Sequence, residues 1–287
     1  VPAAGYQPAE LDGDIVRETR GTGEFYIEFL FPDSVQDGHT YTIEFGDTSL
    51  LHNTGNSFYQ IYDVTGDQNI PKTDTIWIDE TSQSPIVDGF TVFLQNDQAD
   101  LDFDRTGWIE GNSTYRWRVN LDKIFAGNLN LNINYPADYA VRFSDSIIDT
   151  AENKLGYPPR VPTKFRIMNV TENKNAHFQF REFYEVDSTL SPYYPWQNAD
   201  SIEAAVIWVE DPDPDNFLKI KTTWRLYFEA DDENDGSIPP QEGDIFRIAT
   251  KKPFITGDRI TFTVKAERYD AALAQTNLED VAVVPNP

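Results

Sequence analysis

The chain has 287 residues, of which 39% are hydrophobic and 14% aromatic, enough apolar material for one large folded domain or two ordinary ones. Its 23 Lys and Arg against 48 Asp and Glu give a formal net charge of -25, which argues against nucleic acid and anionic membrane surfaces as partners. The absence of cysteine excludes disulfides, thiolate catalysis and cysteine zinc sites. No apolar run approaches the ~18 residues of a membrane span, so we expect no membrane insertion.

Large apolar residues recur at every second position along most of the chain, which is typical of strands with one buried face. The pattern appears in EFYIEFLF (24–31), STYRWRV (113–119) and YAVRF (139–143), and is longest from Phe217 to Ala230. Turn-forming residues separate these runs. Helical spacing is nearly absent, and residues 270–279 are the one segment for which we expect a short helix or linker.

Short strands at regular spacing predict an all-β protein built from two tandem β-sandwich domains, immunoglobulin-like or fibronectin-like. The stretch LGYPPRVPTKF contains Pro158, Pro159 and Pro162, which favour a stiff junction between domains. We therefore expect a first β-sandwich domain over 1–160, a second over 161–269, and a linker over 270–287.

The last ten residues, LEDVAVVPNP, end in a short motif that resembles a known junction. VVPNP is similar to the segment that precedes the C-terminal sorting domain in large bacterial proteins exported by the type IX secretion route. GDIFRIATKKPFITGDRITFTV (243–264) resembles the strand pair that commonly lies just before that junction, and PIVDGFTVFLQND and YPADYAVRFSD resemble segments of the β-rich stalks of such proteins. The resemblance implies a secreted, extracellular or cell-surface protein, with the chain ending where a stalk meets its sorting domain.

Two acidic segments are candidate calcium sites, since calcium prefers carboxylate and carbonyl oxygens. DDENDGSIPPQE (231–242) has the spacing of an EF-hand loop, although two prolines interrupt it and strands flank it. DPDPDN (211–216) repeats the alternation of acids, with Asn216 where a turn would favour glycine. The proposed ligands are Asp231, Glu233, Asp235 and Glu242 in the first segment and Asp211, Asp213 and Asp215 in the second. The alternative for both segments is an ordinary acidic hairpin loop, and for 211–216 it is the favoured interpretation.

SPYYPWQN (191–198) places three aromatic rings, Tyr193, Tyr194 and Trp196, in a proline-braced loop where sugars could stack. The alternative is a loop folded back over the core. Glu203 and Glu210 are the first pair to consider for glycoside hydrolysis, although a chance pair of acids is expected among 48. His39, His52 and His177 lie in unrelated segments without metal-site spacing.

Because the sequence shows no catalytic pattern, we expect a non-catalytic structural, adhesion or assembly module of a secreted cell-surface protein, stabilised by calcium. The alternatives are a carbohydrate-binding module that accompanies a hydrolase, and a glycoside hydrolase. The partners we expect are other surface proteins, glycans or further copies of the chain.

Overall fold

The computed structural model describes residues 6–53, 55–121, 125–126, 129–130, 132–152, 161–180, 202–210, 212, 220–229, 236–272 and 275. Its elements are β-strands and three short 3-10 helices, η1 (Pro32–Ser34), η2 (Thr65–Asp67) and η3 (Phe103–Arg105), so the all-β expectation is confirmed. Within the predicted segment 270–279, residues 271, 272 and 275 are helical, and residues 273, 274 and 276–279 lie outside the described part.

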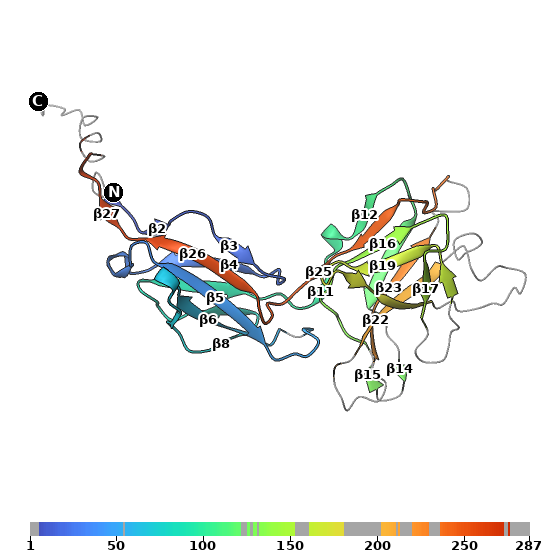
Figure 1. Cartoon of the computed structure of the whole chain (residues 1–287), viewed down its shortest axis with the longest axis horizontal. Helices are drawn as coiled ribbons and strands as arrows, with labels where there is room; N and C mark the ends of the chain where they lie inside the picture. The colour runs from blue at the N-terminus through green and yellow to red at the C-terminus, as the bar shows by residue number, and fades with distance from the viewer. Residues whose placement is uncertain are drawn as a thin grey trace, which may run out of the picture. The chain divides into compact units, whose positions relative to one another are not determined.

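The chain divides into two compact units that are nested in sequence rather than tandem. Unit 1 comprises residues 1–48, 55–97 and 253–287, and unit 2 comprises 49–54 and 98–252 (Figure 1). The expected boundary at 160 is therefore not where the chain divides. The reason is local pairing: β17 (Asp149–Ala151) and β18 (Val161–Thr163) flank the expected boundary and pair antiparallel within unit 2, with Pro162 opposite Thr150. Pro158 and Pro159 lie outside the described residues.

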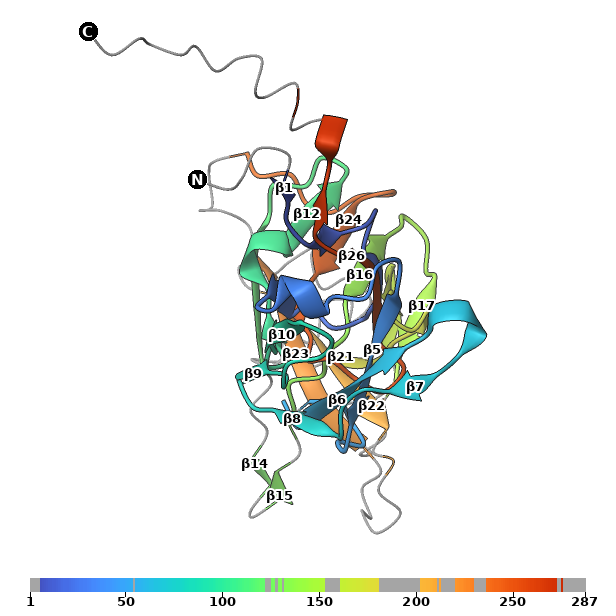
Figure 2. The same cartoon turned by 90° about the vertical axis from the view of Figure 1, so that its left-hand side faces the viewer.

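Unit 1 contains two larger sheets and a short strand pair. The larger sheet runs in the order β2 (Glu10–Leu11), β26 (Arg259–Lys265), β5 (Thr40–Asp47), β6 (Ser57–Asp63) and β7 (Ile70–Pro71), with β3 (Val16–Glu18) also paired to β26 and β8 (Ile76–Ile78) to β6 (Figures 1 and 2). The second sheet runs β4 (Glu24–Phe29), β10 (Phe90–Gln95), β9 (Thr81–Gln83), and the pair is β1 (Tyr6–Gln7) with β27 (Arg268–Tyr269).

Both sheets of unit 1 contribute to one hydrophobic core, because each strand turns alternate side chains inward. Tyr41, Ile43 and Phe262 from the larger sheet are at most 2% exposed, and Phe90 and Val92 from the second sheet are fully buried. Alternate residues of β4, namely Phe25, Ile27 and Phe29, pack against this core, as the alternation in 24–31 predicts. Phe31 lies beyond the end of the strand and is exposed.

A tight hairpin turn at Asp88 and Gly89 closes the second sheet. Val87 and Phe90 exchange two backbone hydrogen bonds, and both turn residues have positive φ, 41° and 93°, the geometry that favours an Asp-Gly pair. A Cβ on Gly89 would lie 2.3 Å from the carbonyl oxygen of Phe31, so glycine is required here.

The chain returns from unit 2 to unit 1 at a clasp formed by Asn96. The Asn96 side chain accepts a hydrogen bond from the backbone N–H of Phe254 (2.9 Å) and donates to Ser57 Oγ (3.1 Å), which in turn donates to the Phe254 carbonyl (2.5 Å). Asn96 is 6% exposed and Ser57 is fully buried. The two ends of the insertion therefore meet within unit 1.

Unit 2 contains two main sheets. The five-stranded sheet runs β12 (Gly107–Glu110), β24 (Ile245–Ile248), β16 (Tyr139–Phe143), β19 (Phe165–Asn169), β20 (Lys174–Asn175). The four-stranded sheet runs β13 (Arg116–Leu121), β23 (Ile220–Glu229), β22 (Ile202–Glu210), β21 (His177–Phe180). Three short pairs accompany them among the described residues: β11 (Asp100–Leu101) with β25 (Thr250–Lys251), β14 (Phe125–Ala126) with β15 (Leu129–Asn130), and β17 with β18.

The two main sheets of unit 2 share a second core that is rich in aromatic rings. Trp224, Phe228 and Phe246 are at most 3% exposed, and the rings of Phe228 and Phe246 meet edge to face with centroids 5.1 Å apart. The inward residues predicted in 115–119, 139–143 and 217–230 are buried or pack against this core wherever they are described, but β23 does not have one open face, because Thr223 and Tyr227 on its other face are also buried. The segment 243–264, which resembles a strand pair, contains two strands that do not pair with each other. β24 belongs to unit 2 and β26 to unit 1.

Candidate functional site: a cavity where a strand changes sheets

A cavity of about 140 Å³ lies in unit 2 where the chain passes directly from one main sheet to the other. β20 is an edge strand of the five-stranded sheet, β21 is an edge strand of the four-stranded sheet, and Ala176 alone joins them. Such a corner separates two edge strands and leaves space between them. The lining residues are Tyr135, Tyr139, Asn169, Lys174, Asn175, Ala176, His177, Trp208, Val209 and Glu210.

One wall of the cavity is organised by the carboxylate of Glu172, in the turn between β19 and β20. Glu172 accepts hydrogen bonds from the hydroxyl of Tyr135 (2.7 Å) and the side-chain amide of Asn169 (2.9 Å), and it forms an ion pair with Lys174 at 2.8 Å. Asn169 also accepts the backbone N–H of Glu172 at 2.9 Å, and Asn173 completes the turn with φ 51°. These contacts hold the polar groups in place before any ligand arrives.

The opposite wall is aromatic. His177 and Trp208 are directly opposite in the pairing of β21 with β22, and their rings stack with centroids 4.3 Å apart at 16°. Trp208 is 2% exposed, whereas the His177 side chain is 44% exposed, so the histidine forms the outer layer. His177 Nδ1 lies 3.2 Å from Glu152 Oε2, which fixes the plane of the ring.

Tyr139 forms part of the cavity lining and is 1% exposed. Among the described residues its hydroxyl has no hydrogen-bond partner. Burial, with the nearby Tyr135 and Glu172, raises the pKa of Tyr139 well above its ordinary value, so the group stays protonated. The hydroxyl oxygen is itself buried, so the ring of Tyr139 and not its hydroxyl forms part of the lining.

The arrangement suits binding better than chemistry. Lys174 and His177 each face a carboxylate, and Glu210 adds a further negative charge to the lining, so the cavity does not favour anions. Its remaining groups are amides, a hydroxyl and ring faces, which bind by hydrogen bonds and stacking.

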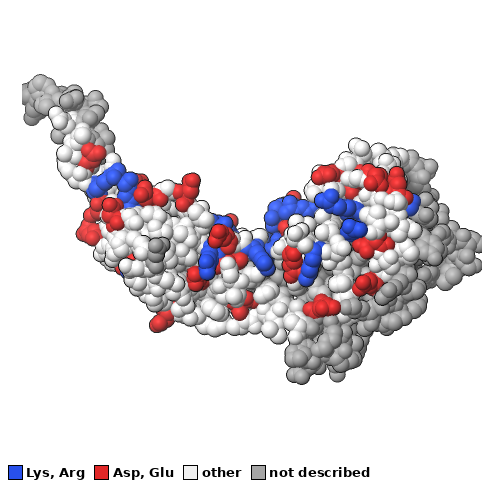
Figure 3. Space-filling view, in the orientation of Figure 1, with Lys and Arg blue, Asp and Glu red and all other residues white. Residues whose placement is uncertain are grey.

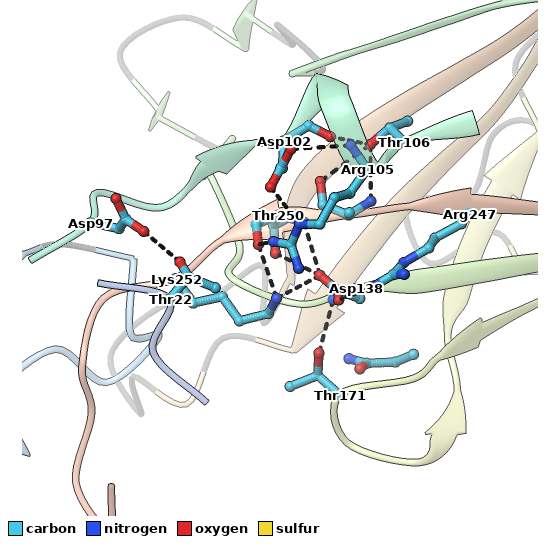
Figure 4. Close-up of polar contacts among 12 residues, drawn as sticks. Thr22, Asp97, Asp102, Arg105, Thr106, Asp138, Thr171, Arg247, Thr250 and Lys252 are labelled. Carbon is cyan, nitrogen blue, oxygen red and sulfur yellow. Dashed lines mark hydrogen bonds and ion pairs between the residues drawn. The ribbon is translucent and has the colours of Figure 1, made fainter. Parts of the chain in front are cut away.

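A second polar cluster in unit 2 surrounds the carboxylate of Asp138 (Figure 4). Asp138 accepts from Lys252 Nζ at 2.5 Å, from the Thr250 N–H at 2.8 Å and from Arg247 at 3.2 Å. Burial alone would raise the pKa of Asp138, but the hydrogen bond and charge of Lys252 outweigh it, and the pKa is lowered. Arg105 donates to the carbonyl of Thr250, so the cluster secures the strand that leads out of unit 2.

Lys and Arg side chains gather on one part of unit 2 in the view of Figure 3, although the chain is strongly acidic overall. Arg142 and Arg166 stand directly opposite each other on β16 and β19, a like-charged pairing that is unfavourable unless compensated. Arg166 donates to the carbonyl of Ile148 and lies 3.8 Å from Asp149. These contacts of Arg166 with Ile148 and Asp149, all within unit 2, offset the repulsion between the two arginines.

Most of the sequence-predicted site residues lie outside the described part of the chain. They are Asp231, Glu233, Asp235, Asp211, Asp213 and Asp215 of the acidic segments, and Tyr193, Tyr194 and Trp196 of the aromatic loop. Glu242 is described: its carboxylate accepts hydrogen bonds from Ser144 Oγ and the Asp145 N–H, both at 2.8 Å, and these bonds lower its pKa. β23 does separate the two acidic segments in sequence. Within the described residues no cluster of three or more potential ligands for a metal is present.

Glu203 and Glu210 lie on the same strand, β22, seven residues apart. At ~3.3 Å per residue their backbones are roughly 20 Å apart, whereas the carboxylates of a glycosidase pair are separated by about 5–9.5 Å. These two residues therefore do not form that pair. Of the histidines, His39 pairs with Asp63 at 2.8 Å in unit 1, and His177 belongs to the cavity.

Sequence reasoning did not find the cavity as a site. Its residues come from four separate segments, and the useful signal was the unbroken run from Lys174 through His177, with no turn between two strands of different sheets. No protein-family model, curated protein or solved structure matches the chain. Among the described residues, none of the helical segments has the length and apolar character needed to cross a membrane.

Proposed function

We propose that the chain is a non-catalytic adhesion module of a secreted cell-surface protein, in which unit 1 is the base and the inserted unit 2 carries the recognition site. The two-sheet cores support modules of the immunoglobulin or fibronectin kind for both units. The resemblance of VVPNP, in residues outside the described part, supports export by the type IX route.

The observation that carries the proposal is the pairing at the two ends of unit 1. β1 pairs antiparallel with β27, with Tyr6 opposite Tyr269, so the chain enters and leaves unit 1 at the same end. β26 crosses the sheet from there, and the clasp at Asn96 and Phe254 lies beyond the opposite end of β26. The connections to unit 2 thus leave unit 1 beyond the end of β26 that lies opposite the β1–β27 pair.

This topology favours display over transmission of force along a stalk. In an in-line stalk module, tension enters at one end and leaves at the other, and shears many hydrogen bonds together. Here tension between the chain ends would peel β1 from β27 one residue pair at a time. We therefore favour a module that displays a recognition unit over one that transmits force along a stalk.

Two measurements test the proposal. Force spectroscopy on the chain held by its ends should show unit 1 opening at low force, and a high, shear-like resistance would contradict the base-and-display arrangement. A surface-adhesion assay should show binding to glycan-coated or cell surfaces by the full chain, and loss of that binding when residues 98–252 are replaced by a short Gly/Ser loop. Retained binding without unit 2 would refute the assignment of recognition to it.

The non-catalytic part of the proposal has its own test. Purified chain incubated with polysaccharide and peptide panels should show no turnover. Turnover of any member of either panel would favour the hydrolase alternative instead.

A further inference from the structure

We propose that the corner cavity of unit 2 binds one neutral sugar residue, exposed at the end or side of a glycan. The inference rests on the proposed adhesive function and names the ligand class of its recognition site. The site differs from the aromatic loop that the sequence suggested for glycans, because its residues come from the end of β19, from β20 and β21, from the end of β22, and from the start of β16 and the segment before it.

The size of the cavity limits the ligand to a single ring. Its volume of about 140 Å³ is well below the roughly 300–1,000 Å³ of pockets that hold drug-sized molecules. Ala176 at the corner contributes a side chain of one carbon, which keeps the space open. An extended chain would have to leave the cavity after one residue.

The chemistry of the lining matches the mixed character of a sugar ring. Each sugar hydroxyl both donates and accepts hydrogen bonds, and therefore needs partners of both kinds. The lining offers a donor in Lys174, an acceptor in Glu210, and both in the amide of Asn175. The apolar C–H face of a sugar can pack on the ring of Tyr135 or His177.

The charges of the lining select a neutral ring over an acidic one. Lys174 is paired with Glu172 at 2.8 Å, and His177 Nδ1 lies 3.2 Å from Glu152, so each of these two basic side chains already has a carboxylate beside it. Glu210 would repel the carboxylate of a uronic acid. The same groups disfavour phosphate and sulfate esters.

The polar wall is also prepared in advance, which reduces the ordering cost of binding. Three side chains are fixed on the Glu172 carboxylate, and the His177 ring is fixed between Trp208 and Glu152. A weak monovalent interaction at such a site becomes useful when many copies of the module meet many sugars on a surface.

The experiment is saturation-transfer NMR on the full chain with methyl glycosides of neutral hexoses and the matching uronic acids, followed by titration for affinity. We expect transfer to at least one neutral glycoside and none to its uronic counterpart. Asn175→Ala should weaken binding about five- to tenfold, the value of one hydrogen bond, and His177→Ala by at least as much. Asn120→Ala, an exposed asparagine on β13 at the other edge of the sheet, is the matched control and should bind like wild type.

Three outcomes would overturn the inference: no transfer to any glycoside, equal binding of uronic acids, or unchanged affinity in Asn175→Ala and His177→Ala with unaltered thermal unfolding. The adhesion assay separates this failure from that of the proposed function. If the cavity variants adhere like wild type while the chain lacking 98–252 does not, unit 2 remains the adhesive unit and the cavity is not its site.

Discussion

The nested topology predicts that the stability of unit 1 depends on whether unit 2 is folded. This dependence requires no contacts between the two units. β26 is an interior strand of the larger sheet of unit 1, and it follows the inserted segment 98–252 in sequence. When unit 2 is folded, its own pairing holds Asp100 opposite Lys251, so the two ends of the insertion are kept together. When unit 2 unfolds, unit 1 must close a flexible loop of about 155 residues.

The size of this coupling follows from loop-closure entropy, which grows as (3/2)RT ln n. Replacing the unfolded insertion of about 155 residues by a six-residue Gly/Ser loop lowers the closure cost by about 3 kcal/mol. A short loop can bridge the gap, because the side chain of Asn96 bonds the backbone of Phe254 at 2.9 Å. For a unit of this size the difference corresponds to a shift of about 10 °C in Tm.

Three proteins provide the comparison: wild type, the six-residue loop variant, and Trp224→Ala/Phe246→Ala. The double substitution removes two side chains that are 2% and 0% exposed and should cost about 6–10 kcal/mol, comparable with the whole stability of a domain. Hydrogen exchange of the amides in β5 and β26 reports the opening of unit 1 alone. We expect the opening free energy of unit 1 to be similar in wild type and in the loop variant. In the double variant we expect it to be about 3 kcal/mol lower.

Two results would refute this reasoning. If β26 exchanges equally slowly in the loop variant and in the double variant with unit 2 unfolded, closure of the insertion does not limit unit 1. If the loop variant fails to fold, unit 1 is not an independent unit, and the division of the chain is wrong.

Three further predictions concern single interactions. Because the pKa of Asp138 is lowered, its stabilising effect is present above the ordinary carboxyl pKa of about 4 and is lost as pH falls through the lower value of the folded state. Asp138→Asn should therefore destabilise unit 2 at pH 7 and lose that effect in acid, as measured by urea unfolding followed by tryptophan fluorescence. Asn96→Ala should cost unit 1 about 1–3 kcal/mol, seen as faster exchange in β26, because it leaves the buried N–H of Phe254 without its acceptor. Calcium at ~100 times its dissociation constant should stabilise wild type by about 2.7 kcal/mol in thermal melts against chelator, and Asp231→Asn/Asp235→Asn should remove the shift.

The strands were predictable because period-two alternation is a local property of sequence. The run 139–143 places Tyr139, Val141 and Phe143 inward whichever strands lie beside it, and the structure buries all three. The same reasoning cannot identify strand partners, since pairing depends on residues far apart in the chain. The pairing of β26 with β5 joins residues more than two hundred positions apart, and nothing in either strand alone indicates it.

The domain boundary was misplaced for a related reason. Prolines are common in linkers, but Pro162 occupies a position in the short β17–β18 pair, where the partner strand tolerates it. The true crossings, near residues 97 and 253, carry Asn96, Asp97 and Pro253, which resemble the turn residues found between many strands of this chain and so do not mark a domain boundary. The Asn96 clasp and the β11–β25 pair fix these crossings by hydrogen bonds. Likewise the cavity depends on the absence of a turn at Ala176, which a search for motifs does not register.

The nesting also determines the order in which the units can form during synthesis. N-terminal domains commonly fold first as the chain emerges. Unit 1 cannot follow that order, because the strand that lies between β2 and β5 is made after the whole of unit 2. Unit 2 has its complete set of described strands, from β11 to β25, once residue 252 has emerged, and its folding brings the two crossings together. The folded insertion thus prepares the closure of unit 1, which is complete only when β26 and β27 pair with strands made at the start of the chain.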